Sequence, residues 1–168
     1  MQTESIRPSL SDEIFHPITI RFADSERDLS LCYSIRQAVF VEEQGIDSAI
    51  EFSGSEVGTQ SLLAYFGSIA VGSARLALDS WSVKLGRVAV LAPWRGQGIG
   101  KELVETAIEF ARKRRALSVV LHAQTTVVSF YEKLGFFVEG SEYLEAGRPH
   151  RTMRLNLMER ESGDHATD

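Results

Sequence analysis

The turn Arg95-Gly96-Gln97-Gly98-Ile99-Gly100-Lys101 is the segment whose residue types most directly suggest binding chemistry. Glycines let a backbone turn tightly and bring several N–H groups to one point. A helix that starts here would add about half a positive charge, and Arg95 and Lys101 add full charges. The turn is therefore predicted to hold a pyrophosphate. The alternative is a glycine-rich connector that binds nothing.

Two common nucleotide motifs do not match this turn. A dinucleotide fingerprint needs its third glycine where the chain has Lys101. A Walker A loop needs glycine at position 95 and serine or threonine at 102, where the chain has Arg95 and Glu102. Any phosphate bound here belongs to another class of ligand.

The charge of the chain excludes some partners. The 168 residues include 18 Lys and Arg against 23 Asp and Glu, a formal net charge of −5, so no nucleic-acid partner is expected. The stretch 75–115 is nevertheless basic and the stretch 1–50 acidic, which favours a local anion site. The only cysteine, Cys32, excludes an internal disulfide framework, and no metal site is expected because no second His or Cys stands at ligand spacing.

The chain reads as one domain without targeting signals. No apolar run approaches the roughly 20 residues that span a bilayer, and the first residues lack a signal-peptide pattern. We expect a cytoplasmic protein with no membrane partner. Its predicted parts are a loose arm over 1–16, a single domain over 17–158 and a tail over 159–168.

Apolar periodicity supplies the elements that must position the glycine turn. Two long helices are predicted, one from Ser25 to about Gly45 and one from Gly98 to about Arg115, with a shorter helix over 125–134. Residues 46–59 read as a loop. Strands are predicted over 18–22, 60–65, 69–78, 83–91, 119–123, 136–140 and 150–157. This order favours an α/β fold (α+β), a mixed sheet flanked by helices.

Four segments of the chain resemble one family. Val88 to Gly100, with Arg95, Gly98 and Gly100, resembles the acyl-CoA signature Arg/Gln-x-x-Gly-x-Gly/Ala of the GNAT acetyltransferases. Residues 124–136 resemble a second GNAT segment, in which Gln124 and Val127 replace the usual asparagine and alanine. Residues 35–45 and 147–153 are similar to a bacterial subgroup described as ElaA-like or YjcF-like. The resemblance covers about residues 18–157 and implies a mostly antiparallel central sheet with helices on both faces.

The resemblance implies acetyl transfer from acetyl-CoA, as co-substrate, to an amine. It places the pyrophosphate on the N–H groups of residues 96–101 beside Arg95, and the pantetheine arm along Val88 to Val90. The predicted cofactor-binding residues are Val88, Val90, Arg95, Gly96, Gln97, Gly98, Ile99, Gly100, Lys101, Gln124 and Tyr131.

The same resemblance implies three catalytic roles. The Val90 N–H is the expected oxyanion donor, Tyr131 the expected general acid for the leaving thiolate, and Glu43 the expected base. Glu42 is an alternative to Glu43. The acceptor site is predicted to use Arg36, Glu42, Glu43 and His150, although Arg36 could instead pair with a glutamate.

Two questions stay open at this level. A non-catalytic acyl-CoA-binding regulatory module on the same fold is the alternative to an N-acetyltransferase. The acceptor can be a small amine, a peptide N-terminus or a lysine side chain, and a homodimer is possible.

Overall fold

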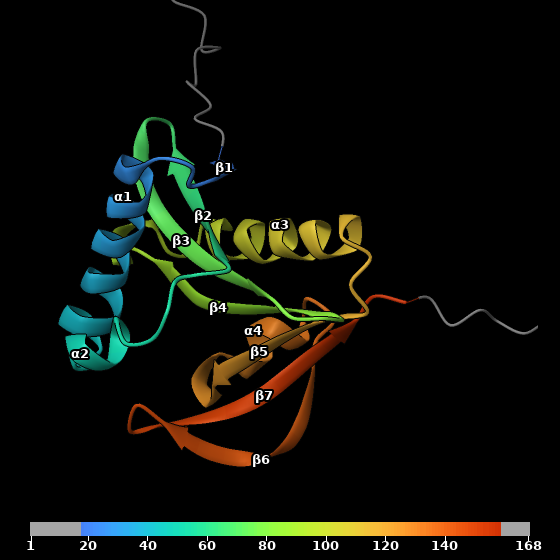
Figure 1. The fold of residues 1–168 in the computed structure, drawn as a ribbon. Helices are drawn as coiled ribbons and strands as arrows, with labels where there is room; N and C mark the ends of the chain where they lie inside the picture. Colours follow the sequence, from blue (N-terminus) through green and yellow to red (C-terminus); the bar gives the residue numbers. More distant parts are fainter. Residues whose placement is uncertain (1–17, 159–168) are drawn as a thin grey trace, which may run out of the picture.

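The computed structural model describes residues 18–158, which form one seven-stranded sheet in the order β1-β2-β3-β4-β5-β7-β6 (Figure 1). Every neighbouring pair is antiparallel except β4 and β5, which run parallel. The predicted mixed, mostly antiparallel sheet is confirmed. The strands are β1 (Ile18–Phe22), β2 (Thr59–Phe66), β3 (Ile69–Leu78), β4 (Ser82–Val90), β5 (Ser118–Gln124), β6 (Phe137–Glu145) and β7 (Arg148–Asn156).

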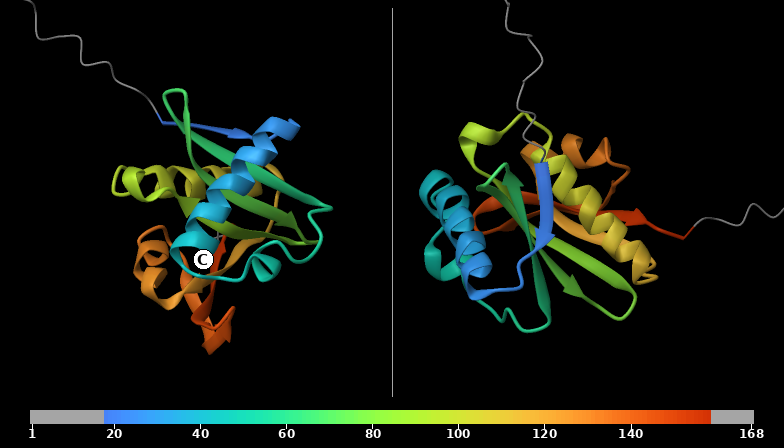
Figure 2. Two further views of the ribbon diagram at one scale, coloured as in Figure 1. Left: turned by 90° about the vertical axis from the view of Figure 1, so that its left-hand side faces the viewer. Right: turned by 90° about the horizontal axis from the view of Figure 1, so that it is seen from above.

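The two long helices cover opposite faces of the sheet (Figure 2). α1 (Glu26–Arg36) packs on β2, β3 and β4, and α3 (Ile99–Lys113) packs on β1 to β5. Successive residues of a strand point to opposite faces, so Leu62 joins the core under α3 and Leu63 the core under α1. No helix among residues 18–158 is long and apolar enough to cross a membrane.

The first helix starts where the sequence predicts it but changes character midway. The Ser25 side chain caps α1 by accepting a hydrogen bond from the Asp28 N–H at 3.1 Å. The Asp28 carboxylate does not complete a capping box, because it binds Arg21 at 2.7 Å. After Arg36 the helix continues as a π-helix, η1 (Gln37–Glu43), in which the Gln44 N–H donates to Val39 O five residues back. Glu43 and Gln44, at the end of this wider turn, line the cavity described below.

Three segments differ from the sequence prediction. The expected loop 46–59 contains a one-turn helix, α2 (Ser48–Glu51), which is too short to show apolar periodicity. The expected helix 125–134 is divided into the 3₁₀ turn η3 (Thr125–Val127) and α4 (Val128–Glu132), and another 3₁₀ turn, η2 (Ala92–Trp94), precedes the glycine turn. The strand predicted over 136–140 continues to Glu145. The predicted arm 1–16 and tail 159–168 lie outside the described residues.

Candidate active site at the opening between β4 and β5

The two halves of the sheet separate along their only parallel seam. β4 and β5 pair from Ser82 and Ser118 to Leu85 and Leu121. Beyond Leu85, β4 stays paired with β3, while β5 stays paired with β7. The two strands therefore diverge, as Figure 1 shows. A cavity of about 630 Å³ opens there, lined by η1, β4, β5, α4 and the β6–β7 hairpin, and its size is typical of small-molecule sites.

Strand pairing turns the backbone of Val90 toward this opening. The Leu91 N–H donates to Val71 O on β3 at 2.9 Å. Alternation along an antiparallel strand then directs the N–H and C=O of Val90 away from β3, to the β5 side. The Val90 carbonyl accepts a hydrogen bond from Arg95 Nε at 2.9 Å. The position fits an oxyanion donor, and that role stays a prediction.

The glycine turn fits a phosphate group. Gly96 and Gly98 have φ values of +77° and +85°, and a Cβ at either would meet nothing within 4 Å, so the turn is open around them. Gly98 is the N-cap of α3 and no side chain caps the helix, which leaves first-turn N–H groups for a ligand. A Cβ at Gly100 would lie 3.5 Å from Phe130 Cζ, so that glycine is held close to α4.

The other predicted members of the turn are placed differently. Gln97 and Lys101 are exposed, and Lys101 lies 3.8 Å from Glu105, a loose ion pair. The Ile99 side chain is buried in the core, so only its backbone can serve a ligand.

Arg95 and Glu43 lie together and bind each other. Two guanidinium nitrogens of Arg95 donate to the two carboxylate oxygens of Glu43, at 2.7 and 2.9 Å. This pairing lowers the pKa of the Glu43 carboxyl. A lowered pKa makes Glu43 a weaker proton acceptor than expected, and Arg95 can hold a phosphate only by sharing or leaving Glu43.

Tyr131 lies in the wall of the cavity at 7% exposure, with its ring edge-on to Phe130 and Phe136. Burial raises the pKa of its hydroxyl well above the usual range. The hydroxyl therefore keeps its proton at any ordinary pH. A protonated, buried hydroxyl suits a proton donor.

Gln124 contacts an amide that the sequence did not single out. Its Nε2 donates to Gln44 Oε1 at 2.8 Å, and Arg148 donates to the Gln44 carbonyl at 2.6 Å. Gln44 thus connects η1 to β5 and to β7. Gln124 remains in the cavity lining, with its amide N–H engaged by this contact.

A histidine cluster forms the β5–β7 wall. His150 is 8% exposed and its Nδ1 lies 2.8 Å from Arg148 O. Glu145 Oε2 lies 3.6 Å from both His150 Nε2 and His122 Nδ1, and the Tyr143 ring contacts both imidazoles. Among residues 18–158 no group of three or more His, Cys, Asp or Glu could hold a metal ion.

Two predicted acceptor residues lie away from the cavity. Arg36 is wholly buried, at 1% side-chain exposure, and binds Glu51 at 2.9 Å and Glu56 at 3.3 Å. Two roles were predicted for Arg36, and the structure shows the pairing with a glutamate. Glu42 is exposed and does not line the cavity, unlike Val88, Val90, Glu43 and His150.

Sequence reasoning missed several residues of the cavity wall, namely Gln44, Glu51, Arg75, Arg87 and Glu145. They come from five different elements and follow no local motif. Only the basic excess over 75–115 pointed to Arg75 and Arg87, and it did not separate them from surface charge.

The fold and the opening define an acyltransferase of the GNAT class, and comparison with known proteins agrees. The chain belongs to the GNAT acetyltransferase domain family, whose model matches residues 34–157. It is 34% identical over 143 residues to YyaT of Bacillus subtilis, covering 83% of this chain and 97% of YyaT. It is 33% identical to the uncharacterized N-acetyltransferase YjcF of the same organism, covering 78% of this chain and 94% of YjcF.

The fold also matches a solved structure of the predicted subgroup. Escherichia coli ElaA superposes with a TM-score of 0.69 at 27% identity, covering 83% of this chain and 100% of ElaA. The predicted membership of an ElaA-like or YjcF-like GNAT subgroup is confirmed.

Proposed function

We propose that the protein is an acetyl-CoA-dependent N-acetyltransferase that moves an acetyl group directly to an amine acceptor. One arrangement carries the proposal: a single cavity is lined by the edge of β4 at Val90, by Tyr131 and by Arg95, and Arg95 directly precedes the glycine turn that leads into the uncapped start of α3. Bound acetyl-CoA would supply the thioester whose C–S bond breaks as the new C–N bond forms.

The chain's own groups provide the remaining requirements. The open turn at Gly96 and Gly98 and the start of α3 offer N–H groups to the pyrophosphate. The N–H of Val90 faces the opening, where it can stabilise negative charge on the carbonyl oxygen. Such a donor typically contributes about 2.7–4 kcal/mol to transition-state stabilisation.

Tyr131 is the proposed proton donor to the departing sulfur. Its raised pKa keeps the hydroxyl protonated, so it can donate a hydrogen bond as charge develops on the thiolate and then pass on its proton. Phe130 and Phe136 hold the ring in place.

Three residues are candidates for the group that takes the proton from the attacking amine. Glu43 lines the cavity, but its pairing with Arg95 lowers its pKa. It remains a candidate if Arg95 turns to the bound pyrophosphate, which would release the carboxylate. His150 and Glu145 stand on the opposite wall.

The glycine turn can be tested by thermal unfolding. Acetyl-CoA should raise the melting temperature, and Gly98→Glu should abolish that shift because a carboxylate repels phosphate. Gly140→Glu is the matched control, since Gly140 also has positive φ and open space but lies on β6. An undiminished shift in Gly98→Glu would place the ligand elsewhere.

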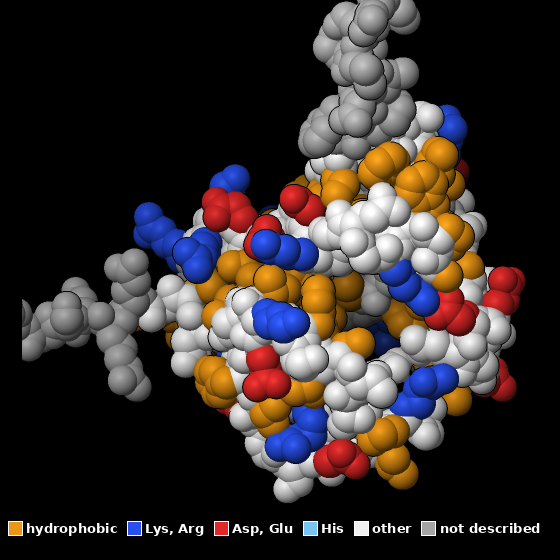
Figure 3. Space-filling view, turned by 180° about the vertical axis from the view of Figure 1, so that it is seen from behind, with side chains coloured by type: hydrophobic (Ala, Val, Ile, Leu, Met, Phe, Trp, Pro, Cys, Tyr) orange, Lys and Arg blue, Asp and Glu red, His pale blue; other side chains and the backbone are white. Residues whose placement is uncertain are grey.

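The remaining expectations stay predictions. They are the cytoplasmic location, the absence of nucleic-acid and membrane partners, the absence of a metal and the possible homodimer. On the face drawn in Figure 3, basic and acidic side chains are interspersed.

A further inference from the structure

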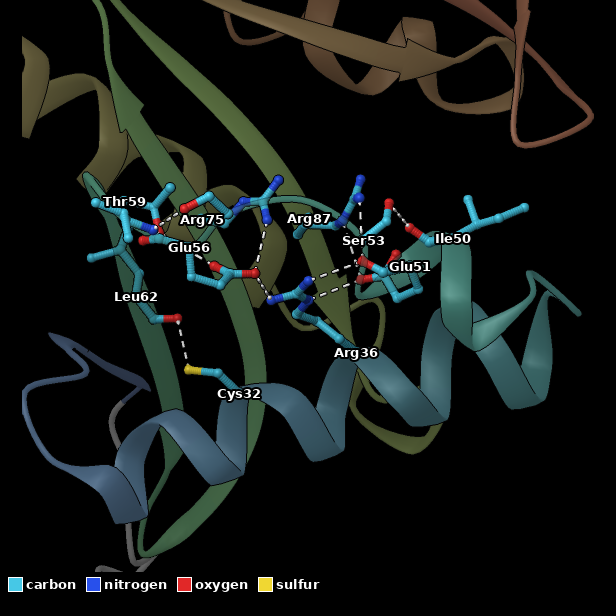
Figure 4. Close-up of polar contacts among 12 residues, drawn as sticks. Cys32, Arg36, Ile50, Glu51, Ser53, Glu56, Thr59, Leu62, Arg75 and Arg87 are labelled. Atoms are coloured by element: carbon cyan, nitrogen blue, oxygen red, sulfur yellow. Dashed lines mark hydrogen bonds and ion pairs between the residues drawn. The ribbon is translucent and has the colours of Figure 1, made fainter.

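A cluster of charged side chains lies beside α1 (Figure 4), and three of its members, Glu51, Arg75 and Arg87, line the cavity. Arg36 donates from Nε to Glu51 Oε1 at 2.9 Å, and Arg87 Nε lies 3.2 Å from the same oxygen. Glu56 Oε1 lies 3.3 Å from Arg36 and 3.0 Å from Arg75. Three guanidinium groups thus share two carboxylates.

The cluster carries an excess of one positive charge, and two of its arginines line the cavity. Arg36 is enclosed, whereas Arg75 and Arg87 are 22% and 29% exposed and line the cavity. Figure 4 shows their guanidinium ends pointing away from α1. Lys84 and Glu145 also line this part of the cavity, and counting both leaves the excess at one positive charge.

Arg87 is held here by an irregular backbone. Gly86 pairs with Arg75 and Ala89 with Ser73, so Arg87 and Val88 together face Ala74 in a β-bulge. Arg87 adopts φ +51°, a left-handed conformation that costs a non-glycine residue about 1–2 kcal/mol. Bulges redirect side chains, and this one directs Arg87 into the cavity wall.

The guanidinium of Arg87 has hydrogen-bonding capacity left over. The Arg87 Nε is buried and makes no hydrogen bond within the described residues. The Arg87 Nη2 donates to the Glu51 carbonyl over a long distance, 3.4 Å. A buried unsatisfied donor costs free energy, and burial lowers the pKa of the Arg87 guanidinium. The terminal nitrogens of Arg87, on a side chain that is 29% exposed and lines the cavity, can donate to an anionic ligand there.

The position of Arg87 separates this site from the phosphate turn. It precedes Val90 by three residues, one of which is taken up by the bulge, so the two lie about 7 Å apart along the strand. The glycine turn follows Val90 on the other side. An anion at Arg87 would therefore belong to the acceptor and not to the pyrophosphate.

From these contacts we infer that the acceptor is an amine that also carries a carboxylate, bound by Arg87 with Arg75 beside it. The inference rests on the proposed function, because it names the acceptor class of that same site.

The test compares amino acids with their carboxamides, which lack the negative charge. The probes are α-amino acids and ε-aminocaproate, each paired with its amide, and the measurement is kcat/KM from CoA release. The ratio of acid to amide should fall at least about tenfold in Arg87→Gln, the value of one charge-assisted hydrogen bond. The acid-to-amide ratio of kcat/KM does not depend on the fraction of enzyme that folds. The acid and its amide also differ in the pKa of the amine, but this difference is the same for every variant and cancels when variants are compared.

Two further variants sharpen the result. Arg87→Lys keeps the charge but loses the planar fork, so its ratio should be intermediate. Lys113→Gln removes one exposed positive charge on α3 and should leave the ratio unchanged. A ratio in Arg87→Gln equal to that of the unmodified protein overturns the inference.

A binding measurement separates this inference from the proposed function. N-acetyl-ε-aminocaproate and its amide are added with CoA, and the shifts in melting temperature are compared. A larger shift for the acid that disappears in Arg87→Gln supports the anion site even if no amine is acetylated. Equal shifts, or none, overturn the anion site even if acetyl transfer occurs.

Discussion

Replacing Arg36 by methionine tests whether this side chain is structural. Its side chain is 1% exposed, it binds Glu51 at 2.9 Å, and Glu51 is itself 3% exposed. Removing one partner of a buried ion pair typically costs about 3–5 kcal/mol. Arg87 still lies 3.2 Å from Glu51 after the change, so we expect the lower end, about 3 kcal/mol.

The measurement is urea unfolding of Arg36→Met and of the matched variant Arg154→Met. Arg154 also binds a carboxylate at 2.8 Å, but both partners are more than 30% exposed, at 33% and 37%. Its loss should cost about 1 kcal/mol or less. Similar losses in the two variants, or an Arg36→Met protein with native stability and a raised KM for the acceptor, would refute the structural role.

Three further predictions concern single side chains. Arg75 and Arg36 outweigh the opposing effect of burial and lower the pKa of Glu56, so its contribution to stability is present above pH 4.5 and is lost as pH falls through the lowered pKa. Acid unfolding of Glu56→Gln should therefore depend less steeply on pH, and an unchanged slope would contradict this. Tyr131→Phe should lower kcat about 10²–10⁴-fold while the acetyl-CoA dissociation constant stays within twofold, roughly; a kcat near that of the unmodified enzyme excludes Tyr131 as proton donor. Cys32 is fully buried and burial raises the pKa of its thiol, so a thiol reagent should label it only after unfolding, and rapid labelling of the native protein would contradict that burial.

The sequence predicted most of the fold because helix caps and strand alternation depend on residues that are close together in the chain. The Ser25 cap and the alternation of β1 specify their elements within a few residues. The π-helix after Arg36 has the same apolar spacing as an ordinary helix, and α2 is one turn long. Neither segment therefore has an apolar periodicity that distinguishes it from the residues around it.

The residues of the candidate site also divide into those that the sequence predicted and those that it missed. The glycine turn is contiguous, so sequence alone located it. Arg95 and Glu43 were both identified, but their mutual ion pair joins residues 52 positions apart and follows from no spacing. The Arg87 cluster depends on a bulge and on α2, and both arise from tertiary contacts. Residue types therefore located the proposed phosphate site, whereas the proposed acceptor site required the fold.

The most direct test of the central claim is to incubate the protein with isotopically labelled acetyl-CoA and a panel of amines, and to identify the product by mass spectrometry. We predict that CoA is released only when an accepted amine is present, and that the label appears on the amine nitrogen. Tyr131→Phe should slow this release and Glu43→Gln should show whether that carboxylate takes part. Binding of acetyl-CoA with no amine-dependent release across the panel would contradict acetyl transfer and leave a non-catalytic acyl-CoA-binding module.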